Sequence, residues 1–237
     1  MFKKIAIIFI VFSITLLMFT YGVIVGTYKT FPYHQIQLIK SAISKDSGLT
    51  ESITTSSGYS SYKELFQYLS SDYDIVFVGD SVTNHGRWNE AFLDKKVANR
   101  GIVNDTSEGI LNRADQIVAL KPDTIYLMFG INDIINGESA EEIFKRYQEI
   151  VSTLAQDNPE IIIQSTLLTN RDGWNIEVNK LNNYLIDFSQ QNNYKYVDLN
   201  KVLAPSGMLT ADASDDGVHL KPAMYIKWFE IIRNNAN

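Results

Sequence analysis

The chain has 237 residues, of which 27 are acidic, 21 are basic and none is cysteine. Its formal net charge of −6 argues against general nucleic-acid binding, because a phosphate backbone selects basic surfaces. The lack of cysteine excludes disulfides, thiolate metal sites, a cysteine nucleophile and a cysteine-linked lipid anchor. The length suits one domain plus an appendage, and 45% hydrophobic residues fit neither a multi-span membrane protein nor a disordered chain.

The N-terminal segment is strongly apolar. Lys3 and Lys4 precede an uncharged run over residues 5–28, made mostly of aliphatic and aromatic side chains. As a helix this run spans roughly 36 Å, which exceeds a hydrocarbon core of about 30 Å. A cleaved signal peptide has a shorter apolar region and a small-residue cleavage site, and a buried core helix would show a polar face. We therefore expect an uncleaved transmembrane helix, with a cleaved signal peptide as the alternative.

The charges beside this run predict its orientation. Lys3 and Lys4 favour a cytoplasmic N-terminus in a single-pass protein of the cell membrane, which places the rest of the chain outside the cytoplasm. Cleavage would instead give a secreted protein. The predicted organisation is a cytoplasmic tip and anchor over 1–28, a membrane-proximal segment and Ser/Thr-rich tether over 29–62, and a folded domain over 63–237.

From about residue 63, short apolar runs alternate with amphipathic stretches. The runs predict strands at 75–78, 96–99, 124–129, 161–163 and 194–199. The amphipathic stretches predict helices at 108–120, 140–156, 176–190 and 222–233. Near-continuous apolar strands that alternate with helices indicate an α/β domain, with a parallel five-stranded sheet covered on both faces. In such sheets the functional site lies beyond the carboxyl ends of the strands.

A candidate nucleophile follows the first predicted strand. Gly79-Asp80-Ser81 comes directly after it, and a serine at a strand-to-helix turn is exposed near the positive end of the next helix. A serine or aspartate in this place is also a common helix N-cap. To act as a nucleophile, Ser81 needs a histidine that takes its proton.

The chain offers three histidines. His34 lies before the folded domain, and His85, four residues after Ser81, has no carboxylate at a fitting spacing. His219 follows Asp216 by three residues, so one short loop can present both side chains, with the carboxylate holding one ring nitrogen while the other faces the serine. For this motif alone, an exposed loop histidine is the alternative. Because Ser81 and His219 belong at the same edge of the predicted sheet, we expect them to act together.

A candidate hydrogen-bond donor follows the third predicted strand, in Gly130-Ile131-Asn132-Asp133. Ester hydrolysis builds negative charge on the carbonyl oxygen, and a fixed donor there is worth about 2.7–4 kcal/mol. The Asn132 amide is a suitable donor, and an Asx turn after a strand is an equally good explanation.

These residues belong to four blocks that occur in a fixed order. The blocks are Gly79-Asp80-Ser81, Asn99-Arg100-Gly101-Ile102-Val103-Asn104-Asp105-Thr106, Gly130-Ile131-Asn132-Asp133 and Asp216-Gly217-Val218-His219. Over about residues 72–235 the sequence resembles the SGNH (GDSL-like) hydrolase family of serine esterases and acylhydrolases. The resemblance implies a three-layer α/β/α domain with a flavodoxin-like parallel sheet. It makes Ser81 the nucleophile, His219 the base and Asp216 its orienting partner, with the Ser81 N–H and the Asn132 amide in the oxyanion hole.

One block departs from the family pattern. The glycine that donates its backbone N–H usually stands immediately before Asp-Thr or Asp-Ser, and here that position is Asn104, whereas Gly101 matches an earlier glycine. Asparagine keeps the backbone donor and tolerates positive φ better than other non-glycine residues. On the resemblance, Asn104 therefore takes the role of the third oxyanion donor.

The remaining candidates are expected to brace loops or to pack in the core: Asp80, Asp105, Asp133, Trp88 and Trp174. Asp215 is a competing partner for His219, at a spacing that matches the family less well. No His/carboxylate cluster indicates a metal, and we expect no cofactor.

The resemblance and the apolar N-terminus together predict a membrane-anchored, extracytoplasmic serine esterase. It would remove O-acetyl or another short acyl group from a cell-surface glycan through an acyl-serine intermediate. The alternatives are an O-acyltransferase with the same triad, a lysophospholipase- or thioesterase-type lipid acylhydrolase, and a non-catalytic envelope-binding protein. The expected partners are an acyl-ester substrate, on a glycan or a lipid, and the membrane; no nucleic acid is expected, and the sequence does not predict the oligomeric state.

Overall fold

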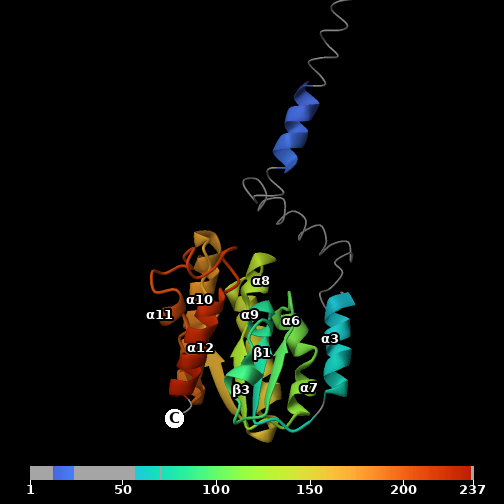
Figure 1. Ribbon diagram of the computed structural model, residues 1–237, viewed down its shortest axis with the longest axis vertical. Helices are drawn as coiled ribbons and strands as arrows, with labels where there is room; N and C mark the ends of the chain where they lie inside the picture. The colour runs from blue at the N-terminus through green and yellow to red at the C-terminus, as the bar shows by residue number, and fades with distance from the viewer. Residues whose placement is uncertain (1–12, 24–56, 70, 236–237) are drawn as a thin grey trace, which may run out of the picture. The chain divides into compact units, whose positions relative to one another are not determined.

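The structure is a computed structural model that describes residues 13–23, 57–69 and 71–235. The chain divides into two units, Met1–Thr50 and Glu51–Asn237, of which each is described by itself. In the first unit, residues 13–23 form a helix (Figure 1). Its exposed apolar side chains include Leu17 and Phe19. Within the described ranges, no helix is both long enough and apolar enough to span a membrane. The rest of the expected anchor lies outside these ranges, so the membrane span stays a prediction.

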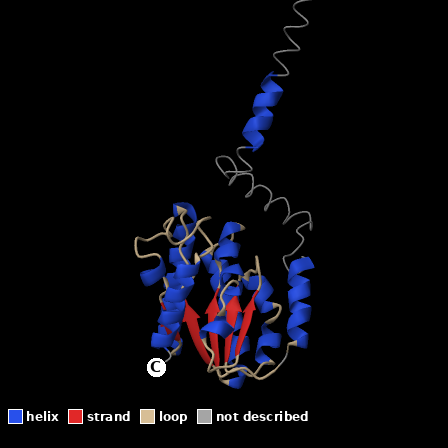
Figure 2. Cartoon of the chain, in the orientation of Figure 1, coloured by secondary structure: helices blue, strands red, loops and turns tan. Residues whose placement is uncertain are grey.

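The second unit is built on one five-stranded sheet. Its strands are β1 (Ile75–Gly79), β2 (Val97–Gly101), β3 (Thr124–Met128), β4 (Glu160–Gln164) and β5 (Lys195–Val197). All neighbouring strands are parallel, as the red arrows of Figure 2 show. Their order in the sheet is β2-β1-β3-β4-β5. This is the strand order of flavodoxin-like sheets. The prediction of an α/β fold with a parallel five-stranded sheet is confirmed.

Helices precede the sheet, connect its strands and follow its last strand. They are α3 (Ser57–Tyr68), α4 (Ser81–Asn84), α5 (Trp88–Ala91), α6 (Ser107–Leu111), α7 (Ala114–Val118), α8 (Ile131–Ile135), α9 (Ala140–Leu154), α10 (Asp172–Asn192), α11 (Asn200–Leu203) and α12 (Pro222–Asn235). The predicted helices that became α9, α10 and α12 are confirmed, with ends that differ by at most four residues.

The core occupies both faces of β1. Val76, Phe77 and Val78 are completely buried. Because successive side chains of a strand point to opposite faces, both faces of the sheet must be covered. On one face the Phe77 ring stacks on Trp88 of α5 at a centroid distance of 3.9 Å, and Trp88 meets Trp228 of α12 edge-on at 4.9 Å. Burying a side chain such as Phe77 contributes about 1.5–3 kcal/mol. Trp88 therefore packs in the core, as predicted, and this packing holds the strand that leads to Ser81.

Between β2 and β3 the structure differs from the prediction of one helix over 108–120. Two short helices, α6 and α7, are separated at Asn112 and Arg113. The interruption turns the Arg113 side chain inward, where it is 1% exposed and pairs with Asp105, Nη2 to Oδ2 2.9 Å. A helical pattern of apolar residues does not reveal a buried ion pair, because the pattern says nothing of which charged side chains face each other.

Helix α3 begins six residues before the predicted domain boundary at residue 63. Tyr59 and Phe66 of this helix are buried, and the Tyr59 hydroxyl donates a hydrogen bond to the Gly109 carbonyl at 2.6 Å. Residues 57–62 therefore belong to the folded unit, and the expectation that they form the end of a tether is wrong. The remainder of the predicted tether lies outside the described residues.

Candidate active site

Strand β1 leads directly into the turn that presents the candidate nucleophile. Gly79 ends β1, Ser81 begins α4, and Asp80 caps that helix by accepting a hydrogen bond from the Val82 N–H at 2.9 Å. A Cβ atom at Gly79 would lie 2.2 Å from the Met128 carbonyl oxygen of β3, so only glycine fits this close approach. The turn therefore places Ser81 at the carboxyl edge of the sheet.

Ser81, His219 and Asp216 form an unbroken series of hydrogen bonds. Ser81 Oγ lies 2.8 Å from His219 Nε2, and His219 Nδ1 lies 2.6 Å from Asp216 Oδ2. Because the carboxylate accepts the Nδ1 proton, Nε2 is free to accept the hydroxyl proton of the serine. Folding thus joins residues 138 positions apart in the arrangement needed for nucleophilic catalysis.

The loop that carries Asp216 is fixed by local hydrogen bonds. Asp216 Oδ1 accepts the backbone N–H groups of His219 at 2.8 Å and of Val218 at 2.9 Å. Gly217 has φ +82°, and a Cβ atom there would lie 2.0 Å from the Asn170 side chain, so glycine is required. Partial burial opposes ionisation of Asp216, but the hydrogen bonds from His219 and Val218 outweigh it and hold its pKa well below the usual range. The carboxylate therefore stays ionised and faces the histidine ring.

The loops after β2 and β3 supply the candidate oxyanion donors. Asn104 has φ +62°, a backbone conformation that favours glycine and that asparagine tolerates. Asn132 Nδ2 donates to the Asp105 carbonyl at 2.8 Å, which fixes this amide beside the Asn104 loop. In the part of the chain that the structure describes, neither the Asn104 N–H nor the Ser81 N–H donates a hydrogen bond. Both groups, and the second amide hydrogen of Asn132, are therefore available to an oxyanion.

A comparison with protein families identifies the architecture. The sequence model of the GDSL-like lipase/acylhydrolase family matches residues 77–226, well over half of the chain and all of the positions above. The chain belongs to this family.

Solved structures share the fold of this acylhydrolase. A GDSL-like lipase from Bacteroides thetaiotaomicron has a TM-score of 0.66 and 19% identity, over 75% of this chain and 96% of that one. An acetylxylan esterase from Geobacillus stearothermophilus, solved as a catalytic mutant, has a TM-score of 0.60 and 18% identity, over 70% and 94%. At these identities the likeness shows the fold alone.

Curated relatives match a shorter part of the acylhydrolase. N-acylneuraminate cytidylyltransferases from Streptococcus agalactiae are 31% identical over 96 residues in a serotype V strain and 33% identical over 97 residues in a serotype III strain. Each match covers 40% of this chain, which spans about a quarter of the length of these relatives, 23% in both cases.

Buried carboxylates brace the oxyanion loops of the acylhydrolase. Burial raises the pKa of Asp80 to about 7, against the Val82 hydrogen bond that lowers it. Burial also raises the pKa of Asp105, although the Arg113 guanidinium opposes the shift. Asp80 Oδ2 is buried and has no hydrogen-bond partner among the described residues, whereas Asp105 is held by Arg113. The two carboxylates are therefore part of the scaffold beneath the site.

Asp133 joins the same scaffold from the loop after β3. Its carboxylate accepts the Ser107 N–H at 3.0 Å and the Ser107 hydroxyl at 2.5 Å, and burial raises its pKa to about 6. Arg146 of α9 donates to Ser107 Oγ at 2.6 Å and also pairs with Asp133 and Glu138. The sequence predicted Asp105 and Asp133 as braces and missed Arg113, Ser107 and Arg146, because no sequence pattern shows which polar side chains pair when the loops and helices fold together.

Three further candidates take definite places. Asp215 pairs with Lys221, Oδ1 to Nζ 2.8 Å, and so does not compete with Asp216 for His219. Trp174 is partly buried, with the guanidinium of Arg171 4.7 Å from its ring centroid. Among the described residues, no group of three or more His, Asp or Glu side chains could hold a metal ion.

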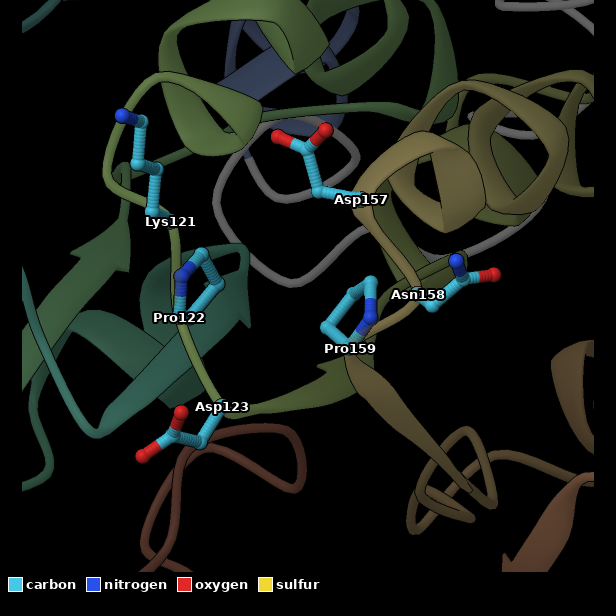
Figure 3. Close-up of a pocket in the computed structure, with 6 residues that line it drawn as sticks. All are labelled: Lys121, Pro122, Asp123, Asp157, Asn158 and Pro159. Atoms are coloured by element: carbon cyan, nitrogen blue, oxygen red, sulfur yellow. The ribbon is translucent and has the colours of Figure 1, made fainter.

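A separate pocket, drawn in Figure 3, lies at the other end of the strands from Ser81. It has a volume of about 440 Å³ and is lined by Lys121, Pro122, Asp123, Asp157, Asn158 and Pro159. These residues directly precede β3 and β4, so the pocket is at the amino ends of the strands, whereas Ser81 follows the carboxyl end of β1. It contains no residue of the candidate site.

Proposed function

We propose that this acylhydrolase is a serine esterase that removes acetyl or another short acyl group from a cell-surface carbohydrate through an acyl-serine intermediate. The observation that carries the proposal is the series of hydrogen bonds from Ser81 through His219 to Asp216. A serine hydroxyl is a weak nucleophile until a base takes its proton, and the 2.8 Å distance to Nε2 permits that transfer.

The reaction has two steps in this geometry. Ser81 Oγ attacks the ester carbonyl carbon while its proton passes to His219 Nε2, and Asp216 stabilises the imidazolium that forms. The tetrahedral intermediate collapses as His219 returns the proton to the alcohol oxygen, which releases the alcohol and leaves the acyl group on Ser81. Water then gives a proton to His219 and attacks the acyl carbon, and the released acid restores the serine.

The negative oxygen of each tetrahedral intermediate needs fixed donors. The Ser81 N–H, the Asn104 N–H and the Asn132 amide take this role in the proposal, since within the described ranges each keeps a hydrogen that no acceptor takes. Each such donor contributes about 2.7–4 kcal/mol to the transition state.

The names of similar proteins support a carbohydrate ester as the substrate. The curated relatives are named for N-acylneuraminate, and similar folds include an acetylxylan esterase and an acetyl-xylooligosaccharide esterase. These names all refer to acylated carbohydrates. A short acyl group is also proposed because Asn104 carries a side chain at a position where glycine, usual in the family, would carry none.

We also propose that an N-terminal anchor holds the enzyme at the outer face of the membrane. Support comes from the uncharged run over 5–28, from Lys3 and Lys4 before it, and from the helix over 13–23 with its exposed apolar side chains. We expect the full-length chain to stay in the membrane pellet after an alkaline carbonate wash and to be digested by protease added to intact cells. A mature N-terminus near residue 26 would show cleavage instead and contradict the anchor.

The catalytic proposal is tested with the full-length chain in mild detergent. Ser81→Ala should lower the hydrolysis of 4-nitrophenyl acetate by at least about 10³-fold without a change in the circular dichroism spectrum. Ser71→Ala, at an exposed serine outside the site, is the matched control and should retain full activity. Equal activities of Ser81→Ala and the wild type would contradict the assignment of Ser81 as the nucleophile.

Product and labelling experiments separate the competing functions. A serine-reactive fluorophosphonate should label Ser81, and failure to label it would favour a non-catalytic binding protein. With an acetyl ester and a glycan acceptor, the esterase should release free acetate, whereas acyl transfer would give an acetylated acceptor. Activity that rises steeply from acetyl to long-chain esters would favour a lipid substrate.

A further inference from the structure

His85 lies beside the catalytic histidine although it belongs to none of the predicted catalytic groups. Its ring centroid is 5.3 Å from that of His219, and the two planes are inclined by 40°. The His85 N–H donates to the Ser81 carbonyl at 3.0 Å, so its backbone stands one helical turn after the nucleophile. The side chain is exposed and, among the described residues, its ring nitrogens make no hydrogen bond.

The chemistry of the triad determines which part of an ester passes this place. His219 Nε2 receives the serine proton and must return it to the alcohol oxygen, so the alcohol oxygen has to come within hydrogen-bond distance of Nε2. In the proposed mechanism the carbonyl oxygen of the ester, in contrast, binds to the donors on the loops that carry Asn104 and Asn132. A side chain next to the His219 ring therefore adjoins the alcohol part of the ester.

The His85 ring has the properties needed to bind hydroxyl groups. Partial burial and the neighbouring His219 ring lower its pKa, while Asp216 opposes the shift, so the imidazole is neutral near neutral pH. A neutral imidazole has one donor and one acceptor nitrogen, and a hydroxyl group can pair with either. A carbohydrate presents hydroxyl groups on the carbons next to the acylated oxygen, whereas an aryl or simple alkyl alcohol does not.

We propose that His85 is a specificity-determining residue that binds a hydroxyl group of the alcohol part of the substrate and so selects polyhydroxylated, carbohydrate esters. The proposal rests on the esterase function described above and adds the side chain that recognises the sugar. It also separates two parts of the site, because the acyl group is selected by the oxyanion loops and the alcohol is selected by His85 at the C-terminal cap of α4.

Two acetyl esters that differ only in the alcohol test this role. Monoacetylated methyl xylosides and 4-nitrophenyl acetate both give acetyl-Ser81, so deacylation is common to them and kcat/KM reports the step in which the alcohol is still bound. The measured quantity is the ratio of kcat/KM for the sugar ester to kcat/KM for the aryl ester, with the full-length chain in mild detergent.

The variants are chosen to separate hydrogen bonding from shape. His85→Phe keeps a ring and removes both nitrogens, and we expect the ratio to fall about 10-fold, the loss of roughly one hydrogen bond. His85→Gln keeps a donor and an acceptor and should stay within about 3-fold of the wild-type ratio. Gln191→Ala, exposed at the far end of α10, is the control and should leave the ratio unchanged. Circular dichroism spectra should match in all four proteins.

The outcomes distinguish this inference from the function on which it rests. A ratio unchanged in His85→Phe, with the sugar ester still a substrate of the wild type, would overturn the role of His85 alone. Wild-type hydrolysis of the aryl ester but of no acetylated xyloside would overturn both the carbohydrate substrate and the role of His85. A fall of the ratio in His85→Phe that His85→Gln restores would support both.

Discussion

At the carboxyl edge of the sheet, the candidate site has an exposed half, the loop of Asp216 and His219, and a buried half, the carboxylates under the loops of Asn104 and Asn132. The two halves differ in what shifts the pKa values of their acidic side chains. On the loop of Asp216 and His219, the side chains are 56% and 38% exposed, and hydrogen bonds lower the pKa of Asp216 against a partial burial that would raise it. Under the oxyanion loops, Asp80, Asp105 and Asp133 are fully buried, and burial raises their pKa values. Hydrogen bonds within one short loop hold Asp216 in the exposed half, whereas Asp105 and Asp133 in the buried half are held by residues of other segments of the chain. Substitutions in the exposed half should therefore lower activity, and substitutions in the buried half should lower stability.

The largest effect is expected for Asp216→Asn, in the exposed half. The amide cannot hold His219 in the tautomer that accepts the serine proton, so kcat should fall by about 10⁴-fold. The free energy of unfolding should change by less than about 1 kcal/mol, because the loop is exposed. Enzyme kinetics with 4-nitrophenyl acetate and urea unfolding provide the two measurements. Asp215→Asn, at the neighbouring carboxylate that pairs with Lys221, is the control and should retain activity within about 2-fold. A large loss of stability in Asp216→Asn would contradict the comparison.

Arg113→Met tests the buried half. It leaves the Asp105 carboxylate buried without its cationic partner, which should lower the free energy of unfolding by about 3–5 kcal/mol. Arg87→Met removes a cation from the exposed Arg87–Glu90 pair and should cost less than about 1 kcal/mol. Urea unfolding of both variants gives the difference. Similar losses in the two variants would show that burial does not set the energy of these pairs.

Asn132→Ala tests the point where the two halves meet. The Asn132 amide is a candidate oxyanion donor, and it also ties its loop to the Asp105 carbonyl. Loss of the donor should lower kcat by about 10²–10³-fold, and KM should change little because the negative oxygen exists only in the transition state. Asn136→Ala, at the exposed end of α8, should leave both constants unchanged. A rise in KM with constant kcat would instead assign Asn132 to substrate binding.

The same contrast explains what could be predicted from the sequence. Ser81, Asn132 and the Asp216–His219 loop follow from short motifs at predicted strand ends, because parallel strands bring their carboxyl ends to one edge. Arg113 could not be predicted, since its role depends on an interruption between α6 and α7 that the apolar pattern over 108–120 does not show. The sequence shows His85 four residues after Ser81, but its proximity to His219 depends on how two segments 134 residues apart in the chain, at 85 and 219, are placed by the fold. Short motifs therefore predict the residues of the candidate site, whereas they do not predict which side chains the fold brings together.

The buried carboxylates should also give stability a pH dependence. Asp80 and Asp133 have pKa values of about 7 and about 6 in the folded chain, above the value of about 3.9 for an unperturbed Asp. Their contribution to the free energy of unfolding is complete below about pH 4. It is lost as the pH rises through 6 to 7, where the folded chain must ionise these carboxyl groups. Asp216, with its lowered pKa, acts in the opposite sense, and its contribution is lost only as pH falls below about 4.

Asp80→Asn isolates one of these groups. The variant cannot ionise, so between about pH 5 and about pH 7.5 its free energy of unfolding should gain on the wild type by on the order of 1 kcal/mol. The carboxamide keeps the oxygen that accepts the Val82 N–H, which preserves the cap of α4. Urea unfolding at the two pH values gives the comparison. Parallel changes in both proteins would show that Asp80 does not titrate in this range.

The smallest effect is expected for Asn104→Gly, and its value lies in the contrast with Asn104→Val. Glycine adopts φ +62° without strain and keeps the backbone N–H, so kcat for an acetyl ester should stay within about 3-fold of the wild type. Valine is β-branched and resists this conformation, so the N–H should turn away and kcat should fall by about 10²-fold. Hydrolysis of butyryl relative to acetyl esters should rise in Asn104→Gly if the asparagine side chain restricts the acyl group. An equal loss of kcat in both variants would mean that the side chain, and not the backbone, is what this position supplies to the oxyanion.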